Sequence, residues 1–122
     1  MHFRLDTSTD KKIGIAVMPE RLDIVSSRQL KSLFHQWMAF TEQFVIDCSQ
    51  LGFIDSTGLG VLVSCLRKSI GQGGDLRLSG LSPRVSMVFE LTRANQLFSI
   101  YLDLKEALES FSHEESNEPS VL

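Results

Sequence analysis

The pattern of hydrophobic and polar positions predicts strands that alternate with helices after an initial hairpin. Phe3 and Leu5 alternate with polar residues, and Ile13–Val17 follows a polar turn, so these two segments are expected to pair as a β-hairpin. Pro19 ends the second strand, because proline cannot donate a hydrogen bond to a central ladder. Residues 20–23 are then expected to form a loop.

The first predicted helix begins at a capping box formed by Ser26 and Gln29. Its apolar residues recur at helical spacing and form one stripe that faces a sheet: Leu30, Leu33, Phe34 and Trp37. Trp37 is therefore expected in the core rather than against a ligand. His35 lies off the stripe and is expected in solvent.

A central strand and a second helix are predicted next. Residues 44–46 are apolar without alternation, which favours a parallel strand covered on both faces. The helix that follows ends at the glycine-rich residues 71–74. Its expected buried stripe is Leu59, Leu62, Val63, Leu66 and Ile70.

The last third of the chain continues the alternation. Residues 75–79 predict a strand, and Ser82 followed by Pro83 predicts a helix start. The buried face of that helix is expected to hold Val85, Val88 and Phe89. A short strand is predicted at 97–100.

A final helix is predicted after Asp103, which is expected to be its cap with Glu106 three residues on. Its apolar stripe is Leu104, Ala107, Leu108 and Phe111. Residues 113–122 are polar and acidic and are expected to form a frayed tail. The elements together predict an α/β fold: one layered domain at residues 1–112, with a mixed sheet of four to five strands and about four helices.

Composition and charge exclude several classes of protein. A chain of 122 residues with 43% hydrophobic and 22% charged residues is typical of one globular domain. The net charge is −3 and no basic cluster is dense, which argues against a nucleic-acid partner. No apolar run approaches the roughly 20 residues that span a bilayer, and the N-terminus turns polar at once, without a signal peptide. We therefore expect a cytoplasmic protein that is not inserted in a membrane.

Candidate chemistry is sparse. His2, His35 and His113 are scattered and have no partner at metal-ligand spacing, so no metal or cofactor is expected. Cys48 and Cys65 lie in apolar segments and are expected to be buried, reduced thiols. No Ser/His/Asp or Cys/His pairing can be argued from spacing, so we do not expect an enzyme.

The stretch from Phe53 to Gly60 is the place where function is expected. Asp55, Ser56 and Thr57 are all residue types that cap helices, so one of them is expected to be a cap. Capping alone does not require Gly58 and Gly60, each of which costs about 1 kcal/mol in a helix relative to alanine. Glycines at a helix start leave the backbone bare, so that another surface can approach closely, and the exposed N–H groups tolerate an anion.

This stretch, FIDSTGLGVL at 53–62, together with FVIDC at 44–48, resembles the signature of STAS domains, and in particular that of bacterial anti-sigma factor antagonists (anti-anti-sigma factors). The resemblance covers roughly residues 3–112. Residues 20–23 resemble the family's loop of glycine, variable residue, leucine and aspartate. Residues 81–85 and 89–92 resemble its later segments.

The resemblance implies a partner switch. In the family, the unphosphorylated antagonist binds an anti-sigma factor that is also a serine kinase with a GHKL-type ATP site, and the sigma factor or other client is released. The kinase phosphorylates the serine after the motif aspartate, which falls on Ser56, and a PP2C-type phosphatase reverses the reaction. Thr57 is an alternative acceptor. The chain is expected to be a monomer when free.

The family match also implies a set of partner-binding residues, in which Asp23 corresponds to the loop aspartate near the phosphorylated serine. That set is Asp23, Asp55, Ser56, Thr57, Gly58, Leu59 and Gly60. Two positions depart from the family. Glu20 replaces a glycine, and residues 93–95 lack the glycine that often follows Leu-Thr; Asn95 is expected to supply a left-handed helix end instead.

The alternative function is a non-switching STAS module, either a subunit of a lipid transporter or a signalling scaffold.

Overall fold

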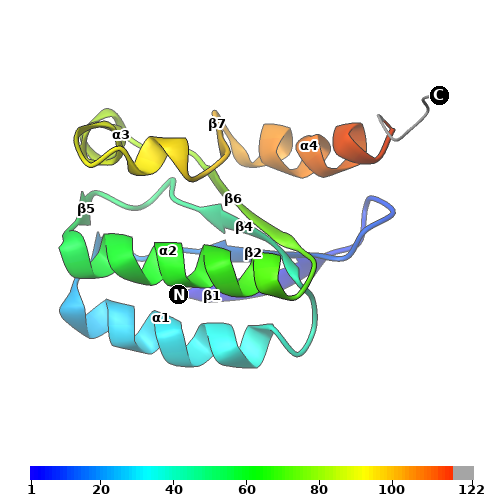
Figure 1. Cartoon of the computed structure of the whole chain (residues 1–122), viewed down its shortest axis with the longest axis horizontal. Helices are drawn as coiled ribbons and strands as arrows, with labels where there is room; N and C mark the ends of the chain where they lie inside the picture. The colour runs from blue at the N-terminus through cyan, green and yellow to red at the C-terminus, as the bar shows by residue number, and fades with distance from the viewer. Residues whose placement is uncertain (117–122) are drawn as a thin grey trace.

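The computed structural model describes residues 1–116, which form a mixed five-stranded sheet, a separate two-stranded ladder and four α-helices. Figure 1 shows how the helices are arranged around the large sheet. The strands are β1 (His2–Asp6), β2 (Ile13–Val17), β3 (Arg21–Leu22), β4 (Gln43–Asp47), β5 (Phe53–Ile54), β6 (Asp75–Ser79) and β7 (Ile100–Tyr101). The helices are α1 (Ile24–Trp37), α2 (Ser56–Gly71), α3 (Pro83–Leu91), the 3₁₀ helix η1 (Ala94–Gln96) and α4 (Leu104–Ser116). The predicted α/β fold is confirmed.

The large sheet has the strand order β1-β2-β4-β6-β7. β1 runs antiparallel to β2, with His2 opposite Val17, so the predicted hairpin is confirmed. The remaining neighbours are parallel, and β4 lies between β2 and β6, as its unbroken apolar sequence predicts. Because the parallel strands share one direction, the segments that follow them meet at one edge of the sheet.

Alternation along each strand divides the core between two faces. Phe44 and Ile46 of β4 belong to the cluster that α1 and α2 cover, whereas Val45 packs with Ala107 and Phe111 of α4. In Figure 1, α1 and α2 lie side by side along one face, and α3 and α4 lie on the opposite side. The predicted central position of Trp37 is confirmed, since its exposed fraction is 7%.

Arg77 is a buried cation in the middle of β6, with an exposed fraction of 5%. Its Nε donates to Asp75 at 3.0 Å and its Nη1 donates to Ser110 of α4 at 2.7 Å. The guanidinium also lies 4.0 Å from the ring centroid of Phe111. A paired and stacked arginine is compatible with burial, and here it ties α4 to the sheet.

Some predicted boundaries are wrong. Residues 20–23 are not all loop, because Arg21–Leu22 forms β3, which pairs in parallel with β5. The last strand is Ile100–Tyr101 rather than 97–100, since Leu97 is the C-cap of η1. α4 continues through Ser116, beyond the expected start of the tail at 113, and the rest of the expected tail lies outside the described residues.

Ile70 does not belong to the buried stripe of α2, since its exposed fraction is 56%. The residues of α2 that are buried are Gly58, Leu62, Cys65, Leu66 and Ser69.

Within the described part of the chain, none of the helices combines the length and the apolar character needed to cross a membrane.

Candidate functional site

Two helix starts lie side by side at one end of the molecule, joined by a two-stranded ladder. β3 leads into α1 and β5 leads into α2, and the two strands pair with Leu22 opposite Ile54. The residue after each strand is an aspartate, Asp23 or Asp55, and each caps the helix that follows. The ladder therefore holds the first turns of α1 and α2 next to each other.

Asp55 is the cap among the three candidates at the start of α2. Its Oδ1 accepts a hydrogen bond from the backbone N–H of Gly58 at 2.9 Å, and its own N–H donates to the carbonyl oxygen of Leu22 at 3.3 Å. This bonding leaves Ser56 and Thr57 free of the capping role.

Ser56 and Thr57 are both exposed, at the first two positions of α2. Neither hydroxyl makes a hydrogen bond to another described residue. They differ in direction, because Ser56 lines a groove between α2 and α3, whereas Thr57 lines a groove between α1 and α2. Gly60 lines both grooves and separates them.

Gly58 and Gly60 have different roles. A Cβ at Gly58 would collide with the carbonyl oxygen of Leu22 and lie 3.0 Å from Cγ1 of Ile54. The surface that approaches Gly58 is therefore this chain's own β3–β5 ladder, and not the outside surface that the sequence led us to expect. A Cβ at Gly60 would meet nothing within 4 Å, so this glycine leaves open space at the surface.

Asp23 is the cap of α1, in a capping box with Ser26 at the third helical position. The predicted box of Ser26 and Gln29 is therefore wrong. Oδ1 of Asp23 accepts from the N–H groups of Val25 and Ser26, each at 3.2 Å. The Ser26 N–H, as the largest cause, holds the pKa of Asp23 below its usual value, and Arg21 contributes by an ion pair at 3.7 Å.

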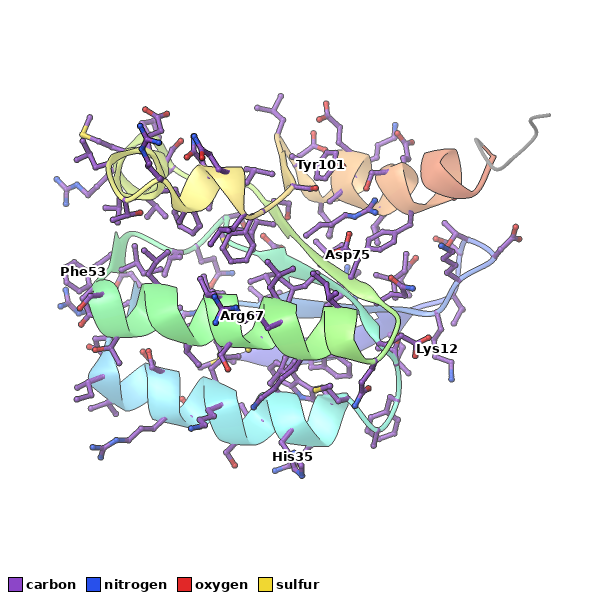
Figure 2. All side chains as sticks on the ribbon, viewed as in Figure 1. Lys12, His35, Phe53, Arg67, Asp75 and Tyr101 are labelled. Atoms are coloured by element: carbon purple, nitrogen blue, oxygen red, sulfur yellow. The ribbon has the colours of Figure 1, made fainter. Side chains whose placement is uncertain are left out.

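The α2–α3 groove has a volume of about 540 Å³. Its walls are mainly apolar and include Ile54, Leu59, Val63, Val88 and Leu97. Ser56 is one of the residues that line this groove. Arg67, which also lines it, lies three helical turns further along the same face of α2. Figure 2 shows Arg67 midway along α2, and Phe53 at the end where the helix begins.

Sequence reasoning missed the contribution of α3 and η1 to this groove. Leu91 and Leu97 have exposed fractions of 78% and 55%, and Leu97 lines the groove. A contiguous exposed apolar patch beside a groove is a candidate interaction surface, and Leu97 adds to the apolar lining here. The usable signal was that Leu91 lies off the buried stripe of α3, which holds Val85 and Phe89, and that Leu97 follows η1 outside any apolar stripe.

The cysteines and the metal-ligating residue types do not form a site beside the two helix starts. Cys48 and Cys65 are free and buried, as predicted, and burial raises the pKa of each thiol to about 12. Across the described residues, no three His, Cys, Asp or Glu side chains are placed to hold a metal ion. The left-handed backbone at the end of α3 falls on Arg93 (φ 64°) and not on Asn95, so that prediction is wrong.

Solved structures share this fold. A protein from Thermotoga maritima is 26% identical, with a TM-score of 0.76 over 88% of this chain and 92% of that protein. The anti-sigma factor antagonist SpoIIAA in its unphosphorylated form is 19% identical, with a TM-score of 0.73 over 92% and 97% of the two chains. SpoIIAA of Bacillus in its phosphorylated form matches with a TM-score of 0.67 over 90% and 99% at the same identity.

The fold is not confined to antagonists. A sulfate transporter family protein from Wolinella succinogenes is 18% identical, with a TM-score of 0.72 over 80% of this chain and 83% of its own. Its likeness concerns the fold alone.

Sequence comparison gives the family. The anti-sigma-B factor antagonist of Staphylococcus aureus is 24% identical over 101 residues, which cover 82% of this chain and 94% of the relative. The family model for the STAS domain matches residues 4–107, which include both capped helix starts and both grooves. This chain belongs to the STAS domain family.

Proposed function

We propose that this chain is a phosphorylation-controlled anti-sigma factor antagonist. The unphosphorylated chain binds an anti-sigma factor that is also a GHKL-type serine kinase, and binding releases the client that the kinase held. Phosphorylation of Ser56 abolishes binding, and a PP2C-type phosphatase restores it. Family membership and the antagonist relative from Staphylococcus aureus support the general role. ATP belongs to the kinase in this proposal, and this chain is its protein substrate.

The position of Ser56 is the observation that carries the proposal. Its hydroxyl is exposed beside the apolar α2–α3 groove, and capping is left to Asp55. A phosphate on Ser56 would meet the N–H end of α2, which favours an anion. The fold would therefore remain intact while the groove gained charge. The phosphorylated form of SpoIIAA supports this, because a protein of the same fold accommodates phosphate.

The electrostatic repulsion that a phosphate introduces is comparable with the free energy needed to switch binding off. A phosphate adds a charge of about −1.5 to −2 next to the half-buried carboxylate of Asp55. Two unit charges about 4 Å apart repel by roughly 4 kcal/mol at a surface-type dielectric constant. Changing a complex from 99% bound to 99% free requires about 5.5 kcal/mol. Repulsion of an acidic group on the partner, together with steric blocking of the groove, reaches that range.

Substitution at Ser56 tests the proposal. Ser56→Ala should bind the anti-sigma factor and resist switching, whereas Ser56→Glu should lose binding and melt at the same temperature as the parent protein. Thr7→Glu is the matched control, because it places the same charge at an exposed position between β1 and β2 that lines neither groove. If Ser56→Glu unfolds the protein, the serine is mainly structural and the proposal is wrong.

Peptide-mapped mass spectrometry of the protein from its own cells, with and without phosphatase treatment, identifies the acceptor. Phosphate on Ser56 supports the switch as proposed. Phosphate on Thr57 moves the acceptor into the α1–α2 groove and keeps the switch. An absence of phosphate under several growth conditions contradicts the switch and favours a constitutive module.

A further inference from the structure

The charge of the chain is divided unevenly between its elements. α1 and α2 contain Arg28, Lys31, Arg67 and Lys68 and no acidic residue, so the two helices carry a formal charge of +4. The whole chain carries −3, which leaves −7 for all other residues. Asp23 and Asp55 are the acids at the helix starts, where their carboxylates bond backbone N–H groups. The layer that these helices form is therefore a basic face on an acidic protein.

Three of these positive side chains border the seam where α1 and α2 meet. Arg28 and Lys31 line the α1–α2 groove, whose volume is about 420 Å³. Lys68 lines a second hollow of about 470 Å³ further along the same two helices, together with His35 and Met38. We call this strip, from Ile24 and Thr57 to Met38 and Gln72, the α1–α2 seam. It is roughly 20 Å long, which is four turns of a helix.

The cations of the seam have no internal partners. Neither Arg28, Lys31 nor Lys68 forms an ion pair with another residue of the described part of the chain, and all three are exposed. Figure 2 shows His35 pointing away from the sheet on the outer side of α1. The seam therefore presents unneutralised positive charge to the outside.

The α1–α2 groove also offers apolar contact surface beside a buried serine. Ser27 lines the α1–α2 groove with an exposed fraction of 4%, and its Oγ has no hydrogen-bond partner among the described residues. A buried polar group without a partner is costly, so such groups normally have one. Oγ of Ser27 is shielded from the groove, and Ser69 and Ser79 share its condition, so this hydroxyl does not identify an occupant. Apolar contact is available beside it on Ile24, which is 52% exposed, and on Val61.

We propose that the α1–α2 seam binds an acidic amphipathic helix of a partner protein. Its carboxylates pair with Arg28, Lys31 and Lys68, and its apolar residues contact Ile24 and Val61. Helices commonly bind in such grooves through one apolar stripe, and complementary charge sets their specificity and association rate. The inference rests on the proposed function for the class of occupant, a protein, and it adds the chemistry of that protein's contacting segment.

The probe is a synthetic helical peptide of about 15 residues, with leucines on one stripe and glutamates beside them. It is titrated into the ¹⁵N-labelled full chain at low and high salt, and amide shifts are followed by NMR. We expect the shifts to concentrate at residues 24–38 and 57–72. Affinity should fall about tenfold or more when every glutamate is replaced by glutamine, and also when salt is raised, because screening weakens exposed charge pairs.

The decisive variant is Arg28→Glu/Lys31→Glu, with Lys12→Glu/Lys105→Glu as the matched control of equal charge. Lys105 belongs to α4, on the other side of the sheet, and Lys12 is labelled near the hairpin turn in Figure 2. The seam variant should lose about tenfold or more in affinity, and the control should change little. If the seam variant melts early, Arg28→Gln/Lys31→Gln replaces it.

Several outcomes would overturn the proposal. These are equal binding of the glutamate and glutamine peptides, shifts confined to α3 and α4, or equal losses in the seam and control variants. Absence of binding up to about 1 mM peptide also counts against it. Vesicles containing phosphatidylglycerol are tested in parallel, and binding to vesicles without binding to the peptide would replace the protein helix with an anionic membrane. The titration involves no phosphate and no kinase, so its failure is distinguishable from failure of the Ser56 switch.

Discussion

Asp23 and Asp55 occupy equivalent positions at two neighbouring helix starts. Each follows one strand of the parallel β3–β5 pair, in which Arg21 lies opposite Phe53 and Leu22 opposite Ile54. Each accepts a hydrogen bond from the N–H of the residue three positions on, Ser26 or Gly58. Because a short ladder fixes both caps, Ser56, the proposed acceptor after Asp55, is held in a defined place relative to α1.

Removal of the Asp55 cap should destabilise the protein without removing Ser56, the proposed acceptor. We expect Asp55→Ala to lower the free energy of unfolding by about 1 kcal/mol, because the Gly58 N–H loses its acceptor. Asp55→Asn should restore most of that loss, since asparagine is also a good cap. Urea unfolding measures both variants. Equal losses for alanine and asparagine would show that the charge of Asp55, and not its capping bond, is what stabilises α2.

Gly58→Ala and Gly60→Ala should have opposite effects on stability. The first places a methyl group against the Leu22 carbonyl and should cost about 1–3 kcal/mol. The second meets open space and should stabilise α2 by up to about 1 kcal/mol. Thermal unfolding distinguishes them. A partner that docks closely over Gly60 should bind Gly60→Ala less tightly, although that variant is the more stable one.

Asp23 should make stability depend on pH in the acidic range. Its folded-state pKa lies below the ordinary value of 3.8, mainly because the Ser26 N–H bonds the carboxylate. The resulting stabilisation is fully present above the ordinary pKa and is lost as the pH falls through the folded-state pKa. Urea unfolding of the parent and of Asp23→Asn should show a difference that is constant from about pH 7 to 5 and shrinks below about pH 4. A difference that grows on acidification would contradict the assignment.

Arg93→Gly should stabilise the chain. Arg93 has φ 64° and ψ 14°, a left-handed conformation that costs roughly 1–2 kcal/mol for a residue with a Cβ. Glycine removes that strain and loses some of the gain to its greater freedom in the unfolded chain, so we expect a net gain of about 0.5–1 kcal/mol. Thermal unfolding should show an increase of a few degrees, and Arg93→Ala should show none. An unchanged midpoint for the glycine variant would mean that the Arg93 side chain offsets the strain.

The sequence predicted the layers of the fold because these depend on burial, which leaves a periodic signal. The apolar run at 44–46 and the stripe of α1 through Leu30, Phe34 and Trp37 are examples, and all of these residues are buried. The two-residue strands β3 and β5 are too short to show a period, and their pairing depends on contacts between distant segments. Ile70 was predicted to be buried because it continues the apolar pattern of α2, but it lies outside the face of the helix that packs against the sheet. Ser69 is buried there instead.

The candidate site was predicted in part. The sequence located the Asp55-Ser56 motif, but it placed Ser26 rather than Asp23 at the cap of α1, because both are capping types three residues apart. It also assigned Arg77 to an ordinary alternating strand, whereas contacts with Ser110 and Phe111 bury it. The two grooves depend on how separate helices pack, and a single helical period does not reveal that.

The ladder between β3 and β5 has a consequence for any enzyme that modifies Ser56. The carbonyl oxygen of Leu22 accepts a hydrogen bond from the Asp55 N–H and packs against Gly58, so Ser56 belongs to a surface built from segments that are distant in the sequence. A linear peptide of residues 50–62 contains the motif but lacks β3, α1 and α3. A kinase specific for this chain would therefore read tertiary structure, and unfolded or partly synthesised chains would escape modification.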